Sequence, residues 1–470
     1  MNYTKQVTLT GAMVACSFSL AWAEDVPVDI YAEAVETQGS VQVETYQAAE
    51  TNSQPQVAIP QKSPMVTQAP KLSRQDNAIL HLSMIRDEVA SMEESGFLGG
   101  LFSSGTELQA TLLQDIDIFL ATYHDLEIAS EALYLRGVIQ FKQGHYEQTA
   151  VTWLQTAYEY PNTDAALNAE KKLKDLVGSD WEKHADQTLA ILNNVGTGNI
   201  PTRLSKLISQ LYPIDDKEVT KPLVLLQVDF LKRFSDDTHA DEVQVLLAHS
   251  LGVESPESGI FGFKKFLSLF PHSSYRPEAM LAIGDLQRLR LKNYEKAVQN
   301  YAKLIEDYPN HSLTIHAHEN LATTYETHLK LYYEALAAFE TIVQKYPEDK
   351  LALTALQHIA TLQEKKTSQV PEAVVTLRKL ATMFHGDEAV EALETAIKIA
   401  DRKLKDAALV LEIQNQLIKD YPDSDAAPAA MYDMAETAEK NGQGKDLYQK
   451  FIDKYPDHKY AKKAQKKLTE

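Results

Sequence analysis

Two consecutive segments of this chain carry the same residue types in the same order. The first reads FPHSSYRPEAMLAIGDLQRLRLKNYEKAVQNYAKLIEDYP (270–309), and the second reads YPNHSLTIHAHENLATTYETHLKLYYEALAAFETIVQKYP (308–347). The aromatic residues Phe270, Tyr308 and Tyr346 that begin or end these segments stand 38 residues apart. A period of this size is typical of stacked helical repeats.

The residue types that recur at fixed distances after these aromatics have a packing explanation. A small residue stands 14 positions later, an alanine 27 positions later and a large apolar residue 31 positions later: Gly284, Ala322 and Ala360, then Ala297, Ala335 and Ala373, then Tyr301, Phe339 and Leu377. A small residue lets a second helix approach closely, and a large one fills the space between pairs. The proline after the aromatic ends a helix because it has no N–H donor. Each segment is therefore predicted to form two antiparallel helices.

Aromatic anchors of this kind recur from residue 123 to residue 455. They are Tyr123, Tyr160, Phe234, Phe270, Tyr308, Tyr346, Phe384, Tyr421 and Tyr455. Their spacing is 34 to 38 residues except for one step of 74, which is twice 37 and indicates a single lost anchor. Turn-forming residues at Gly178, at 196–201 and at Pro213 divide that long step into about four helices, which predicts two further pairs. Lys174 and Lys398 stand where small residues are expected and mark degenerate units.

This pattern resembles the tetratricopeptide repeat. The turns YPDSDAAPAA (421–430) and FPHSSYRPEA (270–279) are similar to those of repeat proteins in the bacterial envelope, namely the outer-membrane assembly lipoproteins and the Tol-Pal-associated cell-division coordinators. The resemblance implies an all-α fold, a right-handed α-solenoid of tetratricopeptide-like helical pairs over residues 124–470. It also implies a scaffold that holds partner proteins on its helical surface.

Composition limits the function classes that the chain can serve. Its 470 residues carry a net charge of −20, which argues against general nucleic-acid binding because such binding needs a basic field. The one cysteine, Cys16, lies near the N-terminus, so no disulfide or cysteine-based metal site is expected in the mature chain.

The N-terminus has the features of an export signal. Lys5 precedes an apolar run from about Val7 to Leu20, and AWA (21–23) precedes two acidic residues. We expect residues 1–23 to be a signal peptide cleaved after Ala23, which predicts a periplasmic protein, either free or associated with the outer membrane. The alternative is a lipoprotein box at 13–16 with Cys16 lipidated.

Two further segments precede the repeats. Residues 24–73 are acidic and lack helical periodicity, so we expect a disordered tether, or alternatively a docking strand at 41–46. Residues 74–123 predict a helical hairpin. The turn of this hairpin contains apolar residues that either fold back onto it or form an exposed tip for a partner or a membrane: Phe97, Leu98, Leu101 and Phe102.

The C-terminal segment 445–470 is basic. It has eight lysines and four acidic residues, a net charge of +4. We expect a solvated helix that caps the last pair, or alternatively a contact with anionic lipid, peptidoglycan or an acidic partner through Lys462, Lys463, Lys466 and Lys467.

No motif predicts catalysis or a cofactor. HENLA (318–322) begins like a zinc-protease helix, but Ala322 replaces the second histidine. His316 and His318 would face different sides of a helix, so with His311 they are expected to be solvated rather than metal ligands.

The sequence therefore predicts a non-catalytic envelope scaffold that binds protein partners, without nucleic acid, metal or cofactor. Envelope assembly or cell division is the expected role, a subunit of a secretion or polysaccharide-export apparatus is the first alternative, and a cell-wall lytic enzyme is the second.

Overall fold

The computed structural model describes residues 72–94, 104–177, 182–214, 216–440 and 442–469. In these ranges the chain is all-helical, and residues 74–470 form one compact unit. The predicted signal peptide, Cys16 and the predicted tether up to residue 71 lie outside the described ranges, as does the hairpin turn 95–103. Among the described helices, none combines the length and apolar character that crossing a membrane requires.

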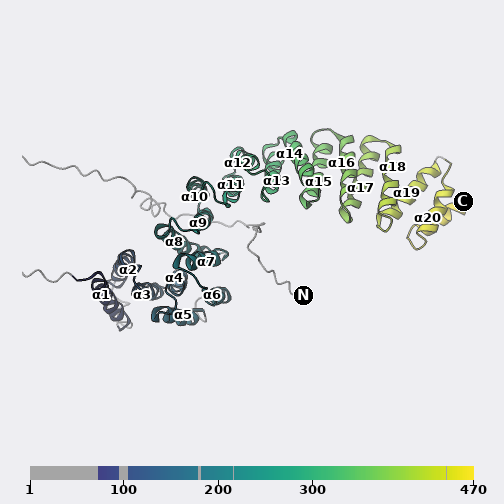
Figure 1. The fold of residues 1–470 in the computed structure, drawn as a ribbon. Helices are drawn as coiled ribbons and strands as arrows, with labels where there is room; N and C mark the ends of the chain where they lie inside the picture. The colour runs from purple at the N-terminus through teal and green to yellow at the C-terminus, as the bar shows by residue number, and fades with distance from the viewer. Residues whose placement is uncertain (1–71, 95–103, 178–181, 215, 441, 470) are drawn as a thin grey trace, which may run out of the picture. The chain divides into compact units, whose positions relative to one another are not determined.

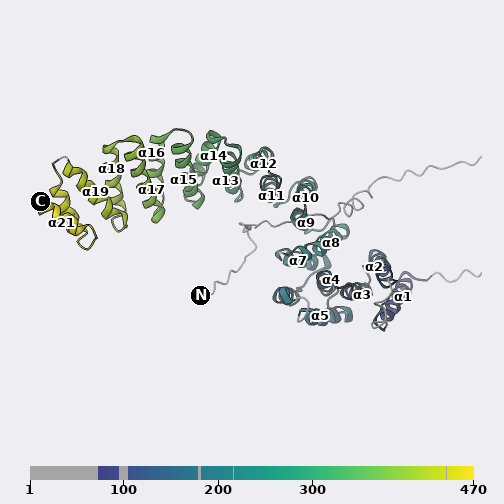
Figure 2. The same cartoon turned by 180° about the vertical axis from the view of Figure 1, so that it is seen from behind.

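The helices follow one another along the chain, as Figures 1 and 2 show. The N-terminal ones are α1 (Arg74–Glu94), α2 (Ser104–Tyr123), α3 (Ala129–Lys142), α4 (Tyr146–Glu159), α5 (Asp164–Val177), a 3-10 turn η3 (Glu182–His184), α6 (Ala185–Leu192), α7 (Ile200–Leu211) and α8 (Lys217–Arg233). The next are α9 (Ala240–Glu254), α10 (Pro256–Leu269), α11 (Arg276–Asp285), α12 (Tyr294–Asp307), α13 (Thr314–Thr324), α14 (Tyr332–Lys345), α15 (Lys350–Lys365) and α16 (Val370–Met383). The last are α17 (Asp387–Ile399), α18 (Ala407–Asp420), α19 (Ala426–Lys440), α20 (Lys445–Lys454) and α21 (Ala461–Thr469). Short π-helical turns extend three of them: η4 (Leu286–Arg290) follows α11, η5 (Tyr325–Leu329) follows α13 and η6 (Ala400–Leu404) follows α17.

From α9 onward, each helix packs mainly against the one before and the one after it. We call α9, α11, α13, α15, α17 and α19 the first helices of their pairs, and the helices that follow them the second helices. The predicted solenoid of tetratricopeptide-like pairs is confirmed.

The small residue of a first helix lies directly against the large residue of its second helix. A Cβ atom built on Gly284 of α11 would lie within 3.0 Å of the Tyr301 ring of α12, and one on Gly137 of α3 would lie equally close to the Trp153 ring of α4. Tyr301 and Trp153 are at most 1% exposed. The spacing of small and large residues in the sequence therefore indicates where the two helices of a pair come into close contact.

The anchor tyrosines tie successive pairs together. They follow the second helices, where their backbone leaves the helical conformation. The Tyr421 hydroxyl donates to the carbonyl oxygens of Ala381 (2.6 Å) and Phe384 (3.2 Å), and Tyr455 donates to Pro422 (3.1 Å). Tyr160 likewise donates to His124 at 2.8 Å. Each of these hydroxyls thus bonds the backbone at or near the preceding anchor, which holds one pair at a fixed distance from the next.

The segment between Tyr160 and Phe234 departs from the expected regular stacking. It contains four α-helices, α5 to α8, as predicted, but α4 packs against α7 and α8 as well as against α5. The expectation of two further regular pairs is therefore wrong, because contacts that span long stretches of sequence bring α7 and α8 onto α4.

A buried ion pair fixes this departure from regularity. The Glu159 side chain at the end of α4 is 1% exposed and pairs with Arg233 of α8, which also binds Asp229 at 3.0 Å. Arg203 of α7 donates to the carbonyl oxygens of Tyr158 (2.6 Å) and Glu159 (2.9 Å). The C-terminal end of α4 is therefore held by both α7 and α8.

We predict opposite effects for two glycine substitutions. Gly284→Ala should lower the free energy of unfolding by about 1–3 kcal/mol, because the added methyl group overlaps the Tyr301 ring. Gly252→Ala in α9 should raise it by up to about 1 kcal/mol, since its added methyl group would meet Leu286 at an ordinary 3.5 Å and alanine is the better helix former. Urea denaturation followed by circular dichroism measures both, and equal effects would contradict the assigned contact.

Candidate partner-binding surface

Contacts between successive first helices form a row of polar pairs on one face of the repeats. Arg288 donates to Asn320 at 3.1 Å, Glu326 pairs with His358 at 2.7 Å, and Glu364 pairs with Lys403 at 3.0 Å. We call these three pairs the polar ladder. One partner of each pair stands four residues after a small packing residue: Arg288, Glu326 and Glu364 follow Gly284, Ala322 and Ala360.

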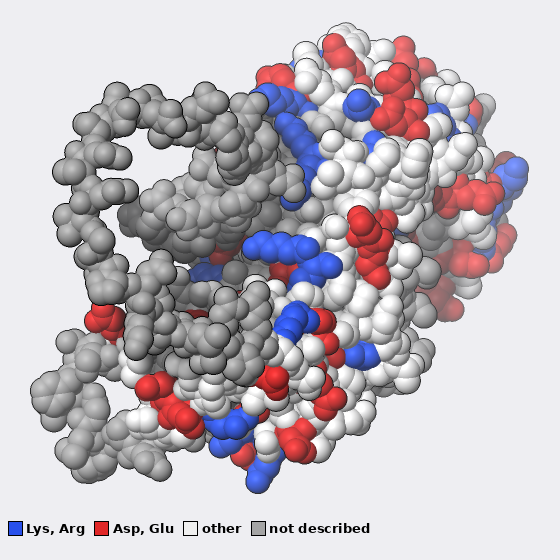
Figure 3. Space-filling view, turned by 60° about the vertical axis from the view of Figure 1, so that its left-hand side comes forward, with Lys and Arg blue, Asp and Glu red and all other residues white. Residues whose placement is uncertain are grey.

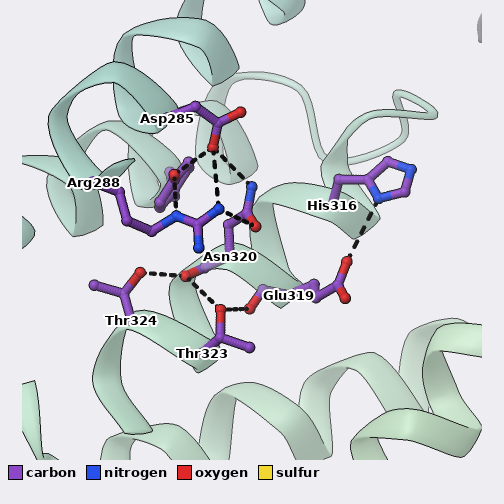
Figure 4. A network of polar contacts seen from close by, with 8 residues as sticks. Asp285, Arg288, His316, Glu319, Asn320, Thr323 and Thr324 are labelled. Carbon is purple, nitrogen blue, oxygen red and sulfur yellow. Dashed lines mark hydrogen bonds and ion pairs between the residues drawn. The ribbon is translucent and has the colours of Figure 1, made fainter. Parts of the chain in front are cut away.

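The first pair of the polar ladder, Arg288 and Asn320, belongs to a larger hydrogen-bond network, shown in Figure 4. The Tyr301 hydroxyl donates to Asp285 at 2.6 Å and accepts from Arg288 at 3.1 Å. The Asn320 amide donates to Asp285 at 3.0 Å. One carboxylate thus organises a second-helix tyrosine, a first-helix arginine and an asparagine of the next pair.

The electrostatics of this network follow from its partial burial. Burial raises the pKa of Asp285 above its ordinary value, and the hydrogen bond from Tyr301 and the charge of Arg288 oppose that rise. Burial and the neighbouring Asp285 charge raise the pKa of Tyr301, so its hydroxyl stays protonated and remains a donor. The side chains of Arg288 and Asp285 are 19% and 33% exposed, and a contact of this kind contributes about 1 kcal/mol or less to stability.

Uncharged polar side chains stand beside the ladder on η5 and α15. Thr327, Gln357 and Thr361 are exposed, and Thr361 shares a helix face with Gln357, four residues before it, and with His358, three residues before it. Amide and hydroxyl groups both donate and accept hydrogen bonds. This surface can therefore pair with the backbone of an extended segment or with the polar side chains of a helix.

The histidines of α13 occupy different environments. His316 is part-exposed, and its Nδ1 lies 3.7 Å from the Glu319 carboxylate. His318 is 6% exposed and packs edge-on against the Tyr346 ring. The prediction that the two face different sides of a helix is confirmed. The expectation that His318 is solvated is wrong, because its position within the repeat belongs to the buried face.

Metal ligands do not gather in the part of the chain that the structure describes: it contains no group of three or more His, Cys, Asp or Glu side chains that could hold an ion. Ala322, which interrupts the zinc-protease pattern, is fully buried as a packing residue. The contacts of the polar ladder are a hydrogen bond and two ion pairs.

The four lysines singled out in the C-terminal segment all lie on α21. Lys462, Lys463 and Lys466 are exposed, whereas Lys467 is half-buried and binds Glu439 of α19 at 3.1 Å. Lys463 also lies over the Tyr460 ring, 5.3 Å from its centroid. At about 100° per residue, the four span roughly 140° of the helix, opposite the buried Ala461 and Ala464. The apolar candidates Phe97, Leu98, Leu101 and Phe102 lie outside the described residues.

The sequence reasoning missed the polar ladder because its members differ in residue type. Arginine, glutamate, asparagine, histidine and lysine all occur in it. The signal was present as a charged residue four positions after the small packing residue in three successive repeats.

Comparison with known proteins defines the class of repeat. A family model described as tetratricopeptide repeat matches residues 131–163 and 278–311, which contain most of α3 and α4 and most of α11 and α12. The chain therefore carries tetratricopeptide repeats, and its helices form a tetratricopeptide-like solenoid. No curated protein matches the sequence.

Several solved structures are similar to parts of the chain. One titled functional characterization of Pseudomonas aeruginosa pilF has 18% identity and a TM-score of 0.31, covering 48% of this chain and 95% of its own. A crystal structure of MamA has 19% identity and a TM-score of 0.27, covering 40% and 93%. A tetratricopeptide repeat protein from Parabacteroides merdae has 12% identity and a TM-score of 0.26, covering 68% and 99%.

Two substitutions on α13 should change the pH dependence of stability in opposite directions. Burial lowers the pKa of His318 to about 4, so folding excludes a proton that the unfolded chain binds below about pH 6.5. The free energy of unfolding of the wild-type protein should therefore fall by about 3 kcal/mol through this group as the pH falls from 6.5 to 4. His318→Leu should remove that decrease.

His316→Gln is the matched control. The hydrogen bond with Glu319 raises the pKa of His316, so its contribution is present below about pH 6.5 and is lost as the pH rises through the folded-state pKa. Urea denaturation at pH 4 to 8 measures, for each variant, the slope of the free energy of unfolding against pH. If both variants changed the slope in the same direction, the assigned environments would be wrong.

Proposed function

We propose that this protein is a non-catalytic scaffold that binds protein partners along the face of its first helices. The polar ladder is the observation that supports this proposal most directly. Its pairs join η4, which follows α11, to α13, then η5, which follows α13, to α15, and α15 to η6, which follows α17, so they hold successive first helices in register. The exposed groups between these pairs are then presented at fixed spacing to a partner. A scaffold whose recognition groups are already positioned loses less entropy on binding.

The charge of this face favours a partner segment with basic residues. At the C-terminal end of the stack, the first helices α17 and α19 carry the carboxylates of Glu391, Glu394 and Asp433. Burial and the neighbouring Glu436 charge raise the pKa of Asp433. A lysine or arginine of a partner would relieve that repulsion.

We place this scaffold in the periplasm of a bacterium, with a role in envelope assembly or cell division. The export signal expected at residues 1–23 and the turns of the repeats support this placement. A subunit of a secretion or polysaccharide-export apparatus is the alternative within the same class. The basic face of α21 is the second proposed contact, with peptidoglycan, anionic lipid or an acidic protein surface.

Crosslinking in cells followed by mass spectrometry should identify the partners, and cell fractionation should recover the chain outside the cytoplasm with Glu24 as its first residue.

With a purified partner, the double variant Gln357→Arg/Thr361→Arg should weaken binding at least tenfold, because two bulky cations would occupy the surface between the pairs of the polar ladder. The matched control Val375→Arg/Leu411→Arg changes exposed residues of the second helices and should leave affinity unchanged.

Two results would contradict this proposal. The first is an unchanged affinity in the first-helix variant together with a loss in the second-helix control. The second is cleavage of purified cell wall by the isolated protein, which would indicate the lytic enzyme instead.

The basic face of α21 is tested separately by charge reversal. Replacing Lys462, Lys463 and Lys466 by glutamate should abolish cosedimentation with peptidoglycan or anionic vesicles at low salt, because the attraction of that face becomes repulsion. Lys467 is kept because it binds Glu439. The control reverses Lys445, Lys450 and Lys454 of α20, and unchanged cosedimentation of the α21 variant would mean that the lysines only cap the stack.

A further inference from the structure

The two ends of the helical stack differ in the surface that they leave uncovered. The terminal units of a stacked repeat need a polar outer face, since no further unit covers them. At the C-terminal end α21 meets this requirement, with exposed lysines opposite its buried alanines. At the N-terminal end α1 does not, because large apolar side chains lie on its outer surface: Ile79 is 50% exposed, Leu80 is 54% exposed and Met84 is 63% exposed.

The outward direction of these side chains is fixed by the contacts of α1. Its core side buries Ala78, Leu82, Ile85 and Val89, each at most 2% exposed. At about 100° per residue, Ile79, Leu80 and Met84 span an arc of roughly 140° on the opposite side of the helix. This arc is the outer face of α1.

Polar contacts to the neighbouring helices prevent α1 from turning this face inward. Arg74 binds Asp125 at 2.6 Å, His81 lies 3.0 Å from Asp115 of α2, and Arg86 binds Glu131 of α3 at 2.6 Å. These contacts lie along the length of α1 and fix its rotation against α2 and α3.

The charges beside the apolar residues identify what this face would bind. Asp76 and Asp87 fall within the same arc, and Glu88 lies about 40° beyond it. The nearest basic side chain, Arg86, is held by two hydrogen bonds to Glu131. Acidic groups around an apolar strip repel an anionic membrane surface and attract a protein surface with lysine or arginine. On the face drawn in Figure 3, acidic and basic side chains are interspersed among uncharged ones.

We propose that the outer face of α1 is a docking site for an amphipathic helix whose apolar strip is flanked by basic residues, supplied by a partner protein. From Asp76 to Asp87 the face extends about 17 Å, so about three turns of a partner helix cover it. This mode of recognition places an apolar strip on an apolar strip and lets the flanking charges select the partner. The site is separate from the polar ladder and does not depend on it.

The test uses the full-length protein and two labelled 18-residue helical peptides. Both carry a leucine strip, which is flanked by lysine in one peptide and by glutamate in the other. Fluorescence anisotropy should show that the lysine-flanked peptide binds at least tenfold more tightly. Leu80→Ser/Met84→Ser should weaken its binding at least tenfold, with an unchanged melting temperature because both residues are exposed.

Two further variants separate this site from general attraction to an acidic protein. Leu225→Ser/Val375→Ser removes equally exposed apolar residues of α8 and α16, and it should leave binding unchanged. Asp87→Lys/Glu88→Lys should reverse the preference toward the glutamate-flanked peptide.

Four outcomes would overturn the proposal. Two of them are equal binding of both peptides by the wild-type protein and equal loss of binding in the control variant. Another is binding to phosphatidylglycerol vesicles that Leu80→Ser/Met84→Ser abolishes, which would assign the face to a membrane. The fourth is a dimer in sedimentation equilibrium that the same variant dissociates, because a second copy would then cover α1.

Discussion

Close contact between a small residue and an aromatic ring is the constraint on which the repeats depend. Gly284 and Gly137 have no side chain because Tyr301 and Trp153 occupy that space. Once the ring is seated, its second helix lies at a set distance from the first. The anchor tyrosine at the end of that helix then reaches the backbone of the preceding pair, as Tyr421 reaches Ala381. Spacing within a pair and spacing between pairs thus come from two aromatic positions.

The same constraint positions the groups available for binding. Because the small residue fixes how a first helix lies, the residues four positions after Gly284, Ala322 and Ala360 reach the next first helix or the turn that follows it. In three successive repeats this residue is charged, and it finds a different partner each time: Asn320, His358 or Lys403. The helices are held in register by contacts that require only complementary chemistry. The surface can therefore vary in residue type from repeat to repeat while the fold stays the same.

The sequence predicted those parts of the structure that depend on local repetition. Anchors, small residues and prolines located the helical pairs of the stack. Reasoning from the repeat failed between Tyr160 and Phe234, where Glu159 meets Arg233 across 74 residues. No periodic signal marks such a pair. The solvation of His318 was misjudged because histidine is usually exposed, whereas here its position in the repeat is a buried one. The hairpin turn with Phe97 and Phe102 stays a prediction.

The ion pair between Glu159 and Arg233 also has a consequence for the order of folding. Along most of the stack each helix needs only its neighbour in sequence, so contact order is low and pairs can form from any starting point. The contact of α4 with α8 instead requires closure of a loop that contains α5, α6 and α7. Closing a loop of this length lowers the entropy of the chain before the stabilising contact between α4 and α8 has formed. From this topology we expect the N-terminal helices to assemble more slowly than the regular pairs that follow them.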